Sequence, residues 1–158
     1  IEPHLAHPHW AVVPDKIGGT VAEQRAMVAT WPHRKEYGAP VWHLGLPLEY
    51  LFDLCNDWPR VCIGSSGEFW KVGSAKWAGR MDETFNALGK QFGRVPWLHG
   101  LRMLGQAAGP WPLASADSTN VGRNFKDGQV CAECMAMRID SINPPTLWTE
   151  RPIQECLI

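Results

Sequence analysis

Short apolar runs alternate along this chain with longer helical patterns, and each apolar run closes on polar or glycine-bearing residues. The runs are WAVVPDKI (10–17), APVWHLG (39–45), RVCIGSSGE (60–68), VPWLHGLRML (95–104) and WPLASA (111–116). Continuously apolar strands that alternate with helices are typical of βαβ units, whose parallel sheet is covered on both faces. The sequence therefore predicts an α/β fold with a parallel sheet.

The segments between these runs carry helix start and stop signals. Thr20 is placed to cap VAEQRAMVATW, Pro47 stands near the first turn of LEYLFDLCNDW, and Ser74 precedes AKWAGRMDETFNALGKQF. Further on, we expect a helix start and then a polar loop over 122–129, and a helix in CAECMAMRIDSI that ends before two prolines. The apolar residues of the tail, TLWTERPIQECLI, are expected to dock on the body of the domain.

Length and composition favour one globular domain. At 158 residues, with 20% charged and 45% hydrophobic residues, the chain is predicted to be a single α/β domain, 1–158, in which 1–9 and 149–158 are peripheral. A formal net charge of -1 argues against a protein that coats DNA through a broad cationic face. No run of about 18 apolar residues is present, so we expect no membrane contact. The odd set of five cysteines favours a reducing, cytoplasmic setting.

The polar residues that close the apolar runs are the candidate site. Ligands of parallel sheets bind beyond the carboxyl ends of the strands, where such residues would meet. Each of them alone is also explained by ordinary turn or capping chemistry, but their repetition at successive strand ends favours one shared pocket. The candidates are Asp15, His43, Ser65, Ser66, Glu68, His99, Arg102, Asp117 and Ser118.

Asp117 is the strongest candidate for chemistry. It lies between the small residues Ala116 and Ser118, so a substrate can approach it closely. A carboxylate in this position can attack a sugar anomeric carbon and form a covalent intermediate. The alternative is that Asp117 only caps a helix that follows it, and the strand end alone leaves both interpretations open.

The GSSGE segment and two histidines are the candidates for ligand binding. Gly64, Ser65 and Ser66 offer backbone N–H groups and hydroxyls to a flat purine-like ring, although Gly-Ser loops are also common connectors. Glu68 is placed either to bind the amino edge of a guanine or to stay solvated. His43 and His99 lie in strand contexts, where a hydrogen-bonded core imidazole is the alternative to a ligand contact.

Metal binding has two weak signals. His4, His7 and His9 lie close together in PHLAHPHW, but two prolines and the terminal position favour a surface segment. Cys131 and Cys134 have CxxC spacing without a second ligand pair. We therefore predict no metal and no dissociable cofactor; zinc held by this pair, with Cys156 or a histidine completing the set, is the alternative.

Several motifs together resemble a known family. APVWHLG, WPRVCIGSSGEFWKVGSAKW, PWLHGLRML and PLASADSTNVGRN occur in the order found in phage-type tRNA-guanine transglycosylase-like proteins, which are grouped with the DNA deazapurine-inserting transglycosylases. The resemblance covers roughly residues 10 to 148. It implies a relative of the TIM barrel that replaces guanine in DNA or tRNA with a 7-deazaguanine base.

The resemblance also implies roles for individual residues. Asp117 in ASADST matches the aspartate that attacks C1′ of the nucleoside, and Asp15 in VVPDKI matches a base-recognising aspartate. The stretch from Ile63 to Glu68 resembles the glycine-rich base-binding loop, and His43 falls at a base-contacting position. The strand motif before the nucleophile and the Arg-Asn pair after it are matched by His99-Gly100-Leu101 and by Arg123-Asn124.

The chain departs from the family pattern at three points. The family usually has an earlier Asp-Ser-Gly-aromatic segment that supplies a second catalytic aspartate, and whether residues before Ile1 supply it stays open. The predicted strands are fewer than the eight of a closed barrel, so the chain resembles the latter part of one, completed by a second copy or a partner chain. The family's zinc pattern of three cysteines and a histidine is not reproduced around Cys131 and Cys134.

Two other functions stay open. One is a catalytically inactive module of the same fold that binds a nucleobase or nucleotide. The other is a metal-dependent hydrolase that uses His4, His7, His9 and Asp117. For the leading function the expected partners are DNA or tRNA and a 7-deazaguanine base, and the expected location is the cytoplasm, of the host if a phage encodes the protein.

Overall fold

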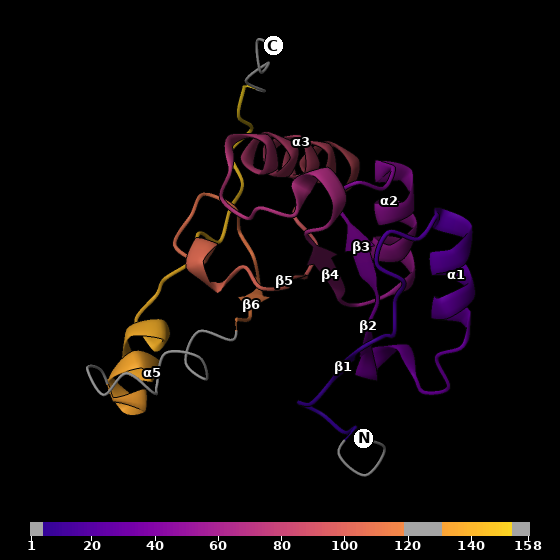
Figure 1. Ribbon diagram of the computed structural model, residues 1–158, viewed down its shortest axis with the longest axis horizontal. Helices are drawn as coiled ribbons and strands as arrows, with labels where there is room; N and C mark the ends of the chain where they lie inside the picture. Colours follow the sequence, from indigo (N-terminus) through magenta and orange to yellow (C-terminus); the bar gives the residue numbers. More distant parts are fainter. Residues whose placement is uncertain (1–4, 119–130, 153–158) are drawn as a thin grey trace.

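The computed structural model describes residues 5–118 and 131–152, which form an α/β fold of parallel strands and helices (Figure 1). The strands are β1 (Ala11–Val12), β2 (Gly38–Ala39), β3 (Val41–His43), β4 (Val61–Gly64), β5 (Leu98–Gly100) and β6 (Ser115–Ala116). The α-helices are α1 (Val21–Ala29), α2 (Leu48–Asp57), α3 (Ala75–Phe92) and α5 (Ala132–Asp140). Three short 3-10 helices lie at Lys35–Tyr37, Gly67–Phe69 and Leu104–Gln106.

Four strands form the main sheet in the order β3-β4-β5-β6, and every pair is parallel. The register sets His43 beside Gly64, Ile63 beside Gly100, and Gly100 beside Ala116. β1 and β2 form a separate parallel pair. The carboxyl ends of the four main strands therefore lie along one edge of the sheet. The order is linear, and within residues 5–118 and 131–152 no barrel closes.

The strands are shorter than the apolar runs that contain them. In the run 111–116, Trp111 and Leu113 are buried, but Pro112 has no N–H and the backbone N–H of Leu113 donates to the carbonyl of Trp111. Pairing with β5 therefore begins only at Ser115. An apolar run therefore indicates that its residues are buried, but only some of these residues pair with a neighbouring strand.

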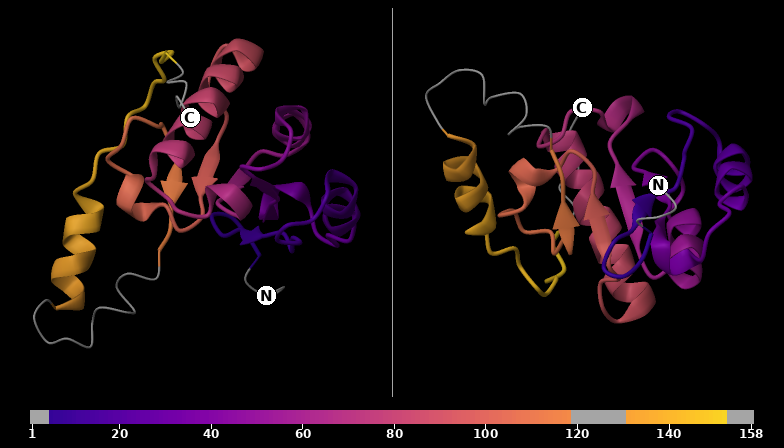
Figure 2. Two further views of the ribbon diagram at one scale, coloured as in Figure 1. Left: turned by 45° about the horizontal axis from the view of Figure 1, so that its top comes forward. Right: turned by 90° about the horizontal axis from the view of Figure 1, so that it is seen from below.

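The helices begin where the sequence predicts. Thr20 and Glu23 form a capping box at the start of α1, and Ser74 accepts a hydrogen bond from the backbone N–H of Trp77 at the start of α3. Gly93 ends α3 with a φ of 67°, a left-handed conformation that favours glycine. Figure 2 shows α5 near the β6 end of the main sheet and α1 and α2 near the opposite end.

Tryptophans fill much of the core and bond through their indole nitrogens. Trp42 and Trp77 are fully buried, and Trp111 meets Trp77 edge-on with ring centroids 5.0 Å apart. The Nε1 of Trp42 donates to the carbonyl of Pro47 at 3.0 Å, and that of Trp111 donates to Asp82 at 2.9 Å. These bonds satisfy the buried polar atoms and fix the loops against the sheet. A search of the helices in the described part of the chain finds none that is long and apolar enough to cross a membrane.

Candidate functional site

A cavity of about 290 Å³ lies at the carboxyl ends of β3, β4, β5 and β6. Its lining includes most of the predicted site residues, which come from separate parts of the sequence and meet only through the parallel sheet. The residues that line it are Asp15, Ile17, His43, Gly64, Ser65, Ser66, Trp70, Val72, Leu101, Arg102 and Asp117.

Asp117 is held by the backbone around it while its side chain stays open to solvent. Its N–H donates to the carbonyl of Gly100 at 3.2 Å, and its carbonyl accepts from the N–H of Leu104 at 3.0 Å. Its Oδ1 accepts a hydrogen bond from the backbone N–H of Arg102, which has a φ of 60°. The side chain is 54% exposed. The carboxylate of Asp117 therefore caps a backbone N–H in the loop after β5. This bond fixes the carboxylate in place, and its exposure leaves it open to a substrate.

His99 lies behind Asp117 and outside the cavity lining. Its Nδ1 and the hydroxyl of Ser115 are 2.7 Å apart, and its Nε2 is 3.8 Å from Oδ1 of Asp117. The ring packs edge-on against Trp10 with centroids 5.2 Å apart. Burial lowers the pKa of His99, and the negative charge of Asp117 opposes this only in part. As a neutral imidazole, His99 therefore supports β6 and the position of Asp117.

Asp15, His43 and Ser66 form a continuous hydrogen-bonded chain. The Nε2 of His43 lies 2.7 Å from Oδ2 of Asp15, and its Nδ1 lies 3.2 Å from the hydroxyl of Ser66. Both ring nitrogens are therefore engaged. Gly64 makes room for this ring, because a Cβ at that position would lie 2.8 Å from Nδ1 of His43. The pairing of β3 with β4 brings His43 to the loop of Ser66, and the segment after β1 adds Asp15.

The other predicted binding residues are placed differently. Ser65 lines the cavity, but its hydroxyl accepts a hydrogen bond from Nε1 of Trp77 at 2.9 Å. Glu68 is exposed, forms an ion pair with Lys76 and is not among the lining residues. Arg102 lines the cavity, whereas Arg123 lies outside the described residues. The part of the GSSGE loop nearest to β4 thus faces the cavity, and Glu68 turns to solvent.

Two exposed apolar side chains at the cavity were not anticipated individually. Trp70 is 70% exposed and Ile17 is 75% exposed, and both belong to the lining. Trp70 lies directly after the 3-10 helix Gly67–Phe69, in a loop with no strand to cover it. The available sequence signal was a tryptophan in a glycine-rich loop outside any helical or strand period.

The cysteines and terminal histidines that the structure describes are not grouped as metal ligands. Among the residues that the structure describes, no group of three or more His, Cys, Asp or Glu side chains is placed to hold a metal ion. Sγ of Cys131 accepts a hydrogen bond from the backbone N–H of Cys134 and caps α5. His7 and His9 are exposed, and His4 and Cys156 lie outside the described residues.

The charges of both cavity carboxylates, Asp15 and Asp117, act on the thiol of Cys62 on β4. Burial, and then the charges of Asp117 and Asp15, raise the pKa of Cys62 to about 12. The thiol is therefore protonated at neutral pH and is no nucleophile. The two charges acting on one buried group are consistent with carboxylates that converge on the same edge of the sheet.

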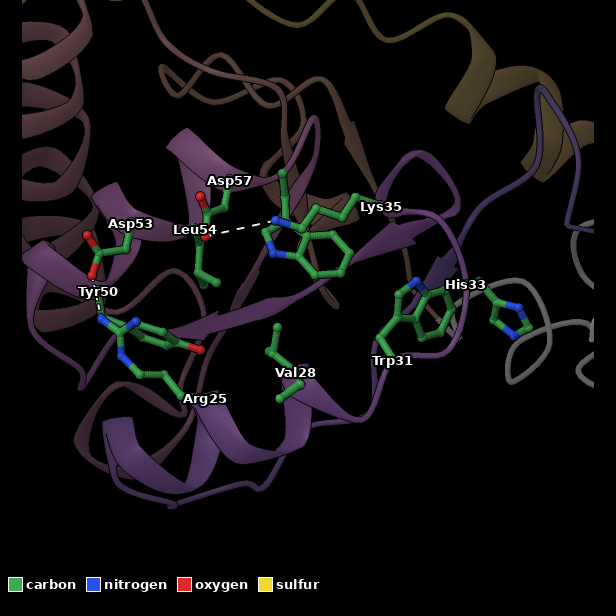
Figure 3. Close-up of a pocket in the computed structure, with 11 residues that line it drawn as sticks. Arg25, Val28, Trp31, His33, Lys35, Tyr50, Asp53, Leu54 and Asp57 are labelled. Atoms are coloured by element: carbon green, nitrogen blue, oxygen red, sulfur yellow. Dashed lines mark hydrogen bonds and ion pairs between the residues drawn. The ribbon is translucent and has the colours of Figure 1, made fainter.

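A larger cavity, of about 390 Å³, lies between α1, α2 and the segment 31–35 (Figure 3). Its charged groups are paired with one another: Arg25 with Asp53 at 2.5 Å, and Lys35 with Asp57 at 4.0 Å. Tyr50 also lines it, but its hydroxyl is buried and has no hydrogen-bond partner in the part of the chain described. Because these charges neutralise each other, the smaller strand-end cavity is the better candidate for chemistry.

Comparison of the chain with protein-family models, curated proteins and solved structures finds no match. The functional argument therefore rests on the residues and geometry of the strand-end cavity.

Proposed function

We propose that the chain carries the nucleophile and base-binding side of a transglycosylase that exchanges guanine in DNA or tRNA for a 7-deazaguanine base. The observation that carries this proposal is the shared cavity, in which Asp117 lies with Asp15, His43 and the Gly64–Ser66 loop. The family resemblance assigns these same positions to the nucleophile and to base recognition.

The chemistry follows from the environment of Asp117. Its exposed carboxylate attacks C1′ of the target nucleoside, and the glycosidic bond breaks with departure of guanine. The N–H of Arg102 holds one carboxylate oxygen and orients the group for attack. The hydrogen-bonding groups of Asp15 and Ser66 contact the polar edge of the base. Return of a deazapurine to C1′ releases Asp117, so the exchange needs no dissociable cofactor.

Trp70 supports a nucleic-acid substrate. A base within a duplex must be turned out of the stack before C1′ and the base enter the cavity, which costs a few kcal/mol. An exposed indole at the cavity offers a stacking surface, and stacking on an aromatic side chain contributes about 1–3 kcal/mol per base. The exposed side chain of Ile17 extends the apolar part of the same wall.

The proposal includes a TIM-barrel architecture. Four adjacent parallel strands in linear order, with ligand groups at their carboxyl ends, are what half of such a barrel would contain. Further strands of the same protein, a second copy or a partner chain would complete it.

The decisive experiment uses Asp117→Asn with Asp57→Asn as the matched control. Asp57 is an exposed aspartate at the end of α2 and outside the strand-end cavity. Release of labelled guanine from DNA and from tRNA is measured in the presence of 7-deazaguanine bases, and denaturing gels detect the covalent adduct. We expect Asp117→Asn to abolish exchange and adduct, and Asp57→Asn to retain both.

Two results would overturn the proposal. Full exchange by Asp117→Asn, with no less adduct than the wild type, would show that Asp117 is not the nucleophile. Tight binding of guanine or a nucleotide by a wild-type protein that releases no base from either nucleic acid supports the inactive binding module instead.

A further inference from the structure

We infer that Ser66, His43 and Asp15 form a proton relay that protonates the departing guanine and deprotonates the incoming base. This inference rests on the proposed function and adds to it an acid–base device supplied by the described chain itself. Its basis is the hydrogen-bonded chain at the cavity, with distances of 3.2 Å from Ser66 to His43 and 2.7 Å from His43 to Asp15.

The hydrogen bonds that join Ser66, His43 and Asp15 can form in two protonation states of the imidazole. With a neutral ring, Nε2–H of His43 donates to Asp15, and the hydroxyl of Ser66 donates to Nδ1. With a protonated ring, both nitrogens donate, and the oxygen of Ser66 accepts from Nδ1–H. The hydroxyl hydrogen of Ser66 then turns toward the cavity. A change of charge on the imidazole therefore reverses the direction of one hydrogen bond and leaves no group unpaired.

The environment favours a relay over a passive contact. The side chain of His43 is 9% exposed, so a purine reaches the imidazole through Ser66, which is half-buried and lines the cavity. The side chain of Asp15 is 25% exposed and sits on the far side of the ring, where its carboxylate accepts the Nε2–H of His43 in both protonation states. Ser65, the neighbouring hydroxyl, is bonded to Trp77 and has no part in this chain.

The proton balance of the exchange closes without another reactant. As the C1′–N bond breaks and the carboxylate of Asp117 bonds to C1′, the electron pair of the broken bond stays on guanine. The hydroxyl of Ser66 gives its proton to a ring nitrogen of guanine and takes one from Nδ1 of His43. In the second half the incoming base gives its ring N–H proton to Ser66, which returns one to His43, and the base nitrogen displaces Asp117 from C1′.

A change of leaving group tests the relay. A 7-methylguanine nucleotide is cationic, and its base departs as a neutral molecule that needs no proton. We compare single-turnover release of labelled guanine and of labelled 7-methylguanine by the wild type, Ser66→Ala and His43→Gln, on DNA and on tRNA. Both variants are expected to slow guanine release by about 100-fold. The slowing of 7-methylguanine release is expected to be much smaller in both variants, because this base departs without a proton.

Ser65→Ala is the matched control for damage to the loop. Ser65 lines the same cavity, but its hydroxyl bonds to Trp77 and not to His43, so any loss is expected to be equal for the two bases. A second measurement compares rates in water and deuterium oxide: guanine release by the wild type should slow in deuterium oxide, and this dependence should vanish in Ser66→Ala.

The outcomes separate the two proposals. Equal losses for both bases in Ser66→Ala and His43→Gln, or an unchanged solvent isotope effect, overturn the relay while the transglycosylase stands. A wild type that releases neither base, or an Asp117→Asn variant that exchanges normally, overturns the function and the relay with it.

Discussion

His99 and Asp117 show how two polar residues at one sheet edge acquire different roles. The imidazole is buried against Trp10 and bonded to Ser115, whereas the carboxylate 3.8 Å away is 54% exposed. Burial suppresses the charge on His99, and exposure leaves Asp117 available to a substrate. Adjacent strands thus present one buried supporting residue and one solvent-exposed carboxylate.

The lowered pKa of His99 predicts acid sensitivity. Its folded value lies below the unfolded value of about 6.5, so the unfolded chain takes up this proton first as pH falls. The associated stability is present above about pH 6.5 and is lost as pH falls toward the folded pKa. His99→Gln should reduce the pH slope of the unfolding free energy in this range by up to ~1.4 kcal/mol per pH unit.

Urea denaturation at a series of pH values checks this prediction, with His9→Gln, a change in an exposed histidine, as the control. An unchanged slope in His99→Gln would show that another group governs the acid response.

The sequence predicted most of the strand-end residues that line the cavity, but placed Glu68 and His99 there wrongly and did not show how the others bond. Asp15, His43 and Asp117 follow apolar runs, and parallel pairing brings such positions to one edge. The bond between His43 and Asp15 spans 28 residues of sequence and depends on the path of the backbone after Val13, which no local pattern specifies. Glu68 turns to solvent and pairs with Lys76 near the start of α3, an orientation that the Gly-Ser loop sequence left open.

At the scale of the element, β4 helps to position the site because one of its residues, Gly64, has no side chain. Gly64 lies beside His43 in the sheet, and a Cβ there would lie 2.8 Å from Nδ1 and 3.0 Å from Cε1 of that ring. The missing side chain therefore provides the space in which the imidazole bonds to Asp15 and Ser66.

Two glycine-to-alanine changes should shift stability in opposite directions. Gly64→Ala is expected to destabilise the fold by about 1–3 kcal/mol, because the buried ring must move, and to impair base exchange. Gly79→Ala, inside α3 with no atom within 4 Å of the added Cβ, should stabilise by about 0.5–1 kcal/mol through better helix propensity.

Urea unfolding and the guanine-release assay measure both variants. Stabilisation by Gly64→Ala with normal guanine release would show that His43 does not need this space.

Helix starts were predictable from sequence, and strand lengths were not. Capping by Thr20 and Ser74 depends on residues three positions away, so the signal is local. A strand extends only as far as its neighbour pairs with it, and β1 and β6 each retain two residues of much longer apolar runs. Apolar runs in the sequence therefore overestimate the length of the hydrogen-bonded strands.

At the scale of the whole molecule, α/β alternation and parallel pairing are confirmed, and the TIM barrel remains a proposal. The sheet is built from local βα units, so the repeating pattern predicts it well. Closure depends on which strands lie beside β3 and β6, and a pattern of hydrophobicity carries no such information.

Long-range contacts also hold the segment 148–151 against α3. The sequence predicted that apolar residues of the tail dock on the body of the domain. The side chain of Asn86 is nearly buried and accepts hydrogen bonds from Nε1 of Trp148 at 2.9 Å and from the N–H of Arg151 at 3.1 Å. It also donates to the carbonyl of Arg151 at 2.8 Å. Phe85 packs against Trp148 with ring centroids 5.3 Å apart. Two ion pairs, Lys90 with Glu150 at 2.9 Å and Arg151 with Asp82 at 3.2 Å, also join the segment to α3, and the amide of Asn86 is its buried polar anchor.

Replacing this anchor should release the segment while the sheet stays folded. Asn86→Ala removes three hydrogen bonds and is expected to cost about 1–3 kcal/mol, since the indole N–H of Trp148 then loses its acceptor. Hydrogen exchange followed by mass spectrometry should show faster exchange over residues 147–152 and little change over β3 to β5. Asn143→Ala, at an exposed asparagine, is the control. Unchanged exchange over 147–152 in Asn86→Ala would mean that the packing of Trp148 and the ion pairs of Glu150 and Arg151 hold the segment without this amide. Equally faster exchange in the sheet would mean that this contact supports the whole domain.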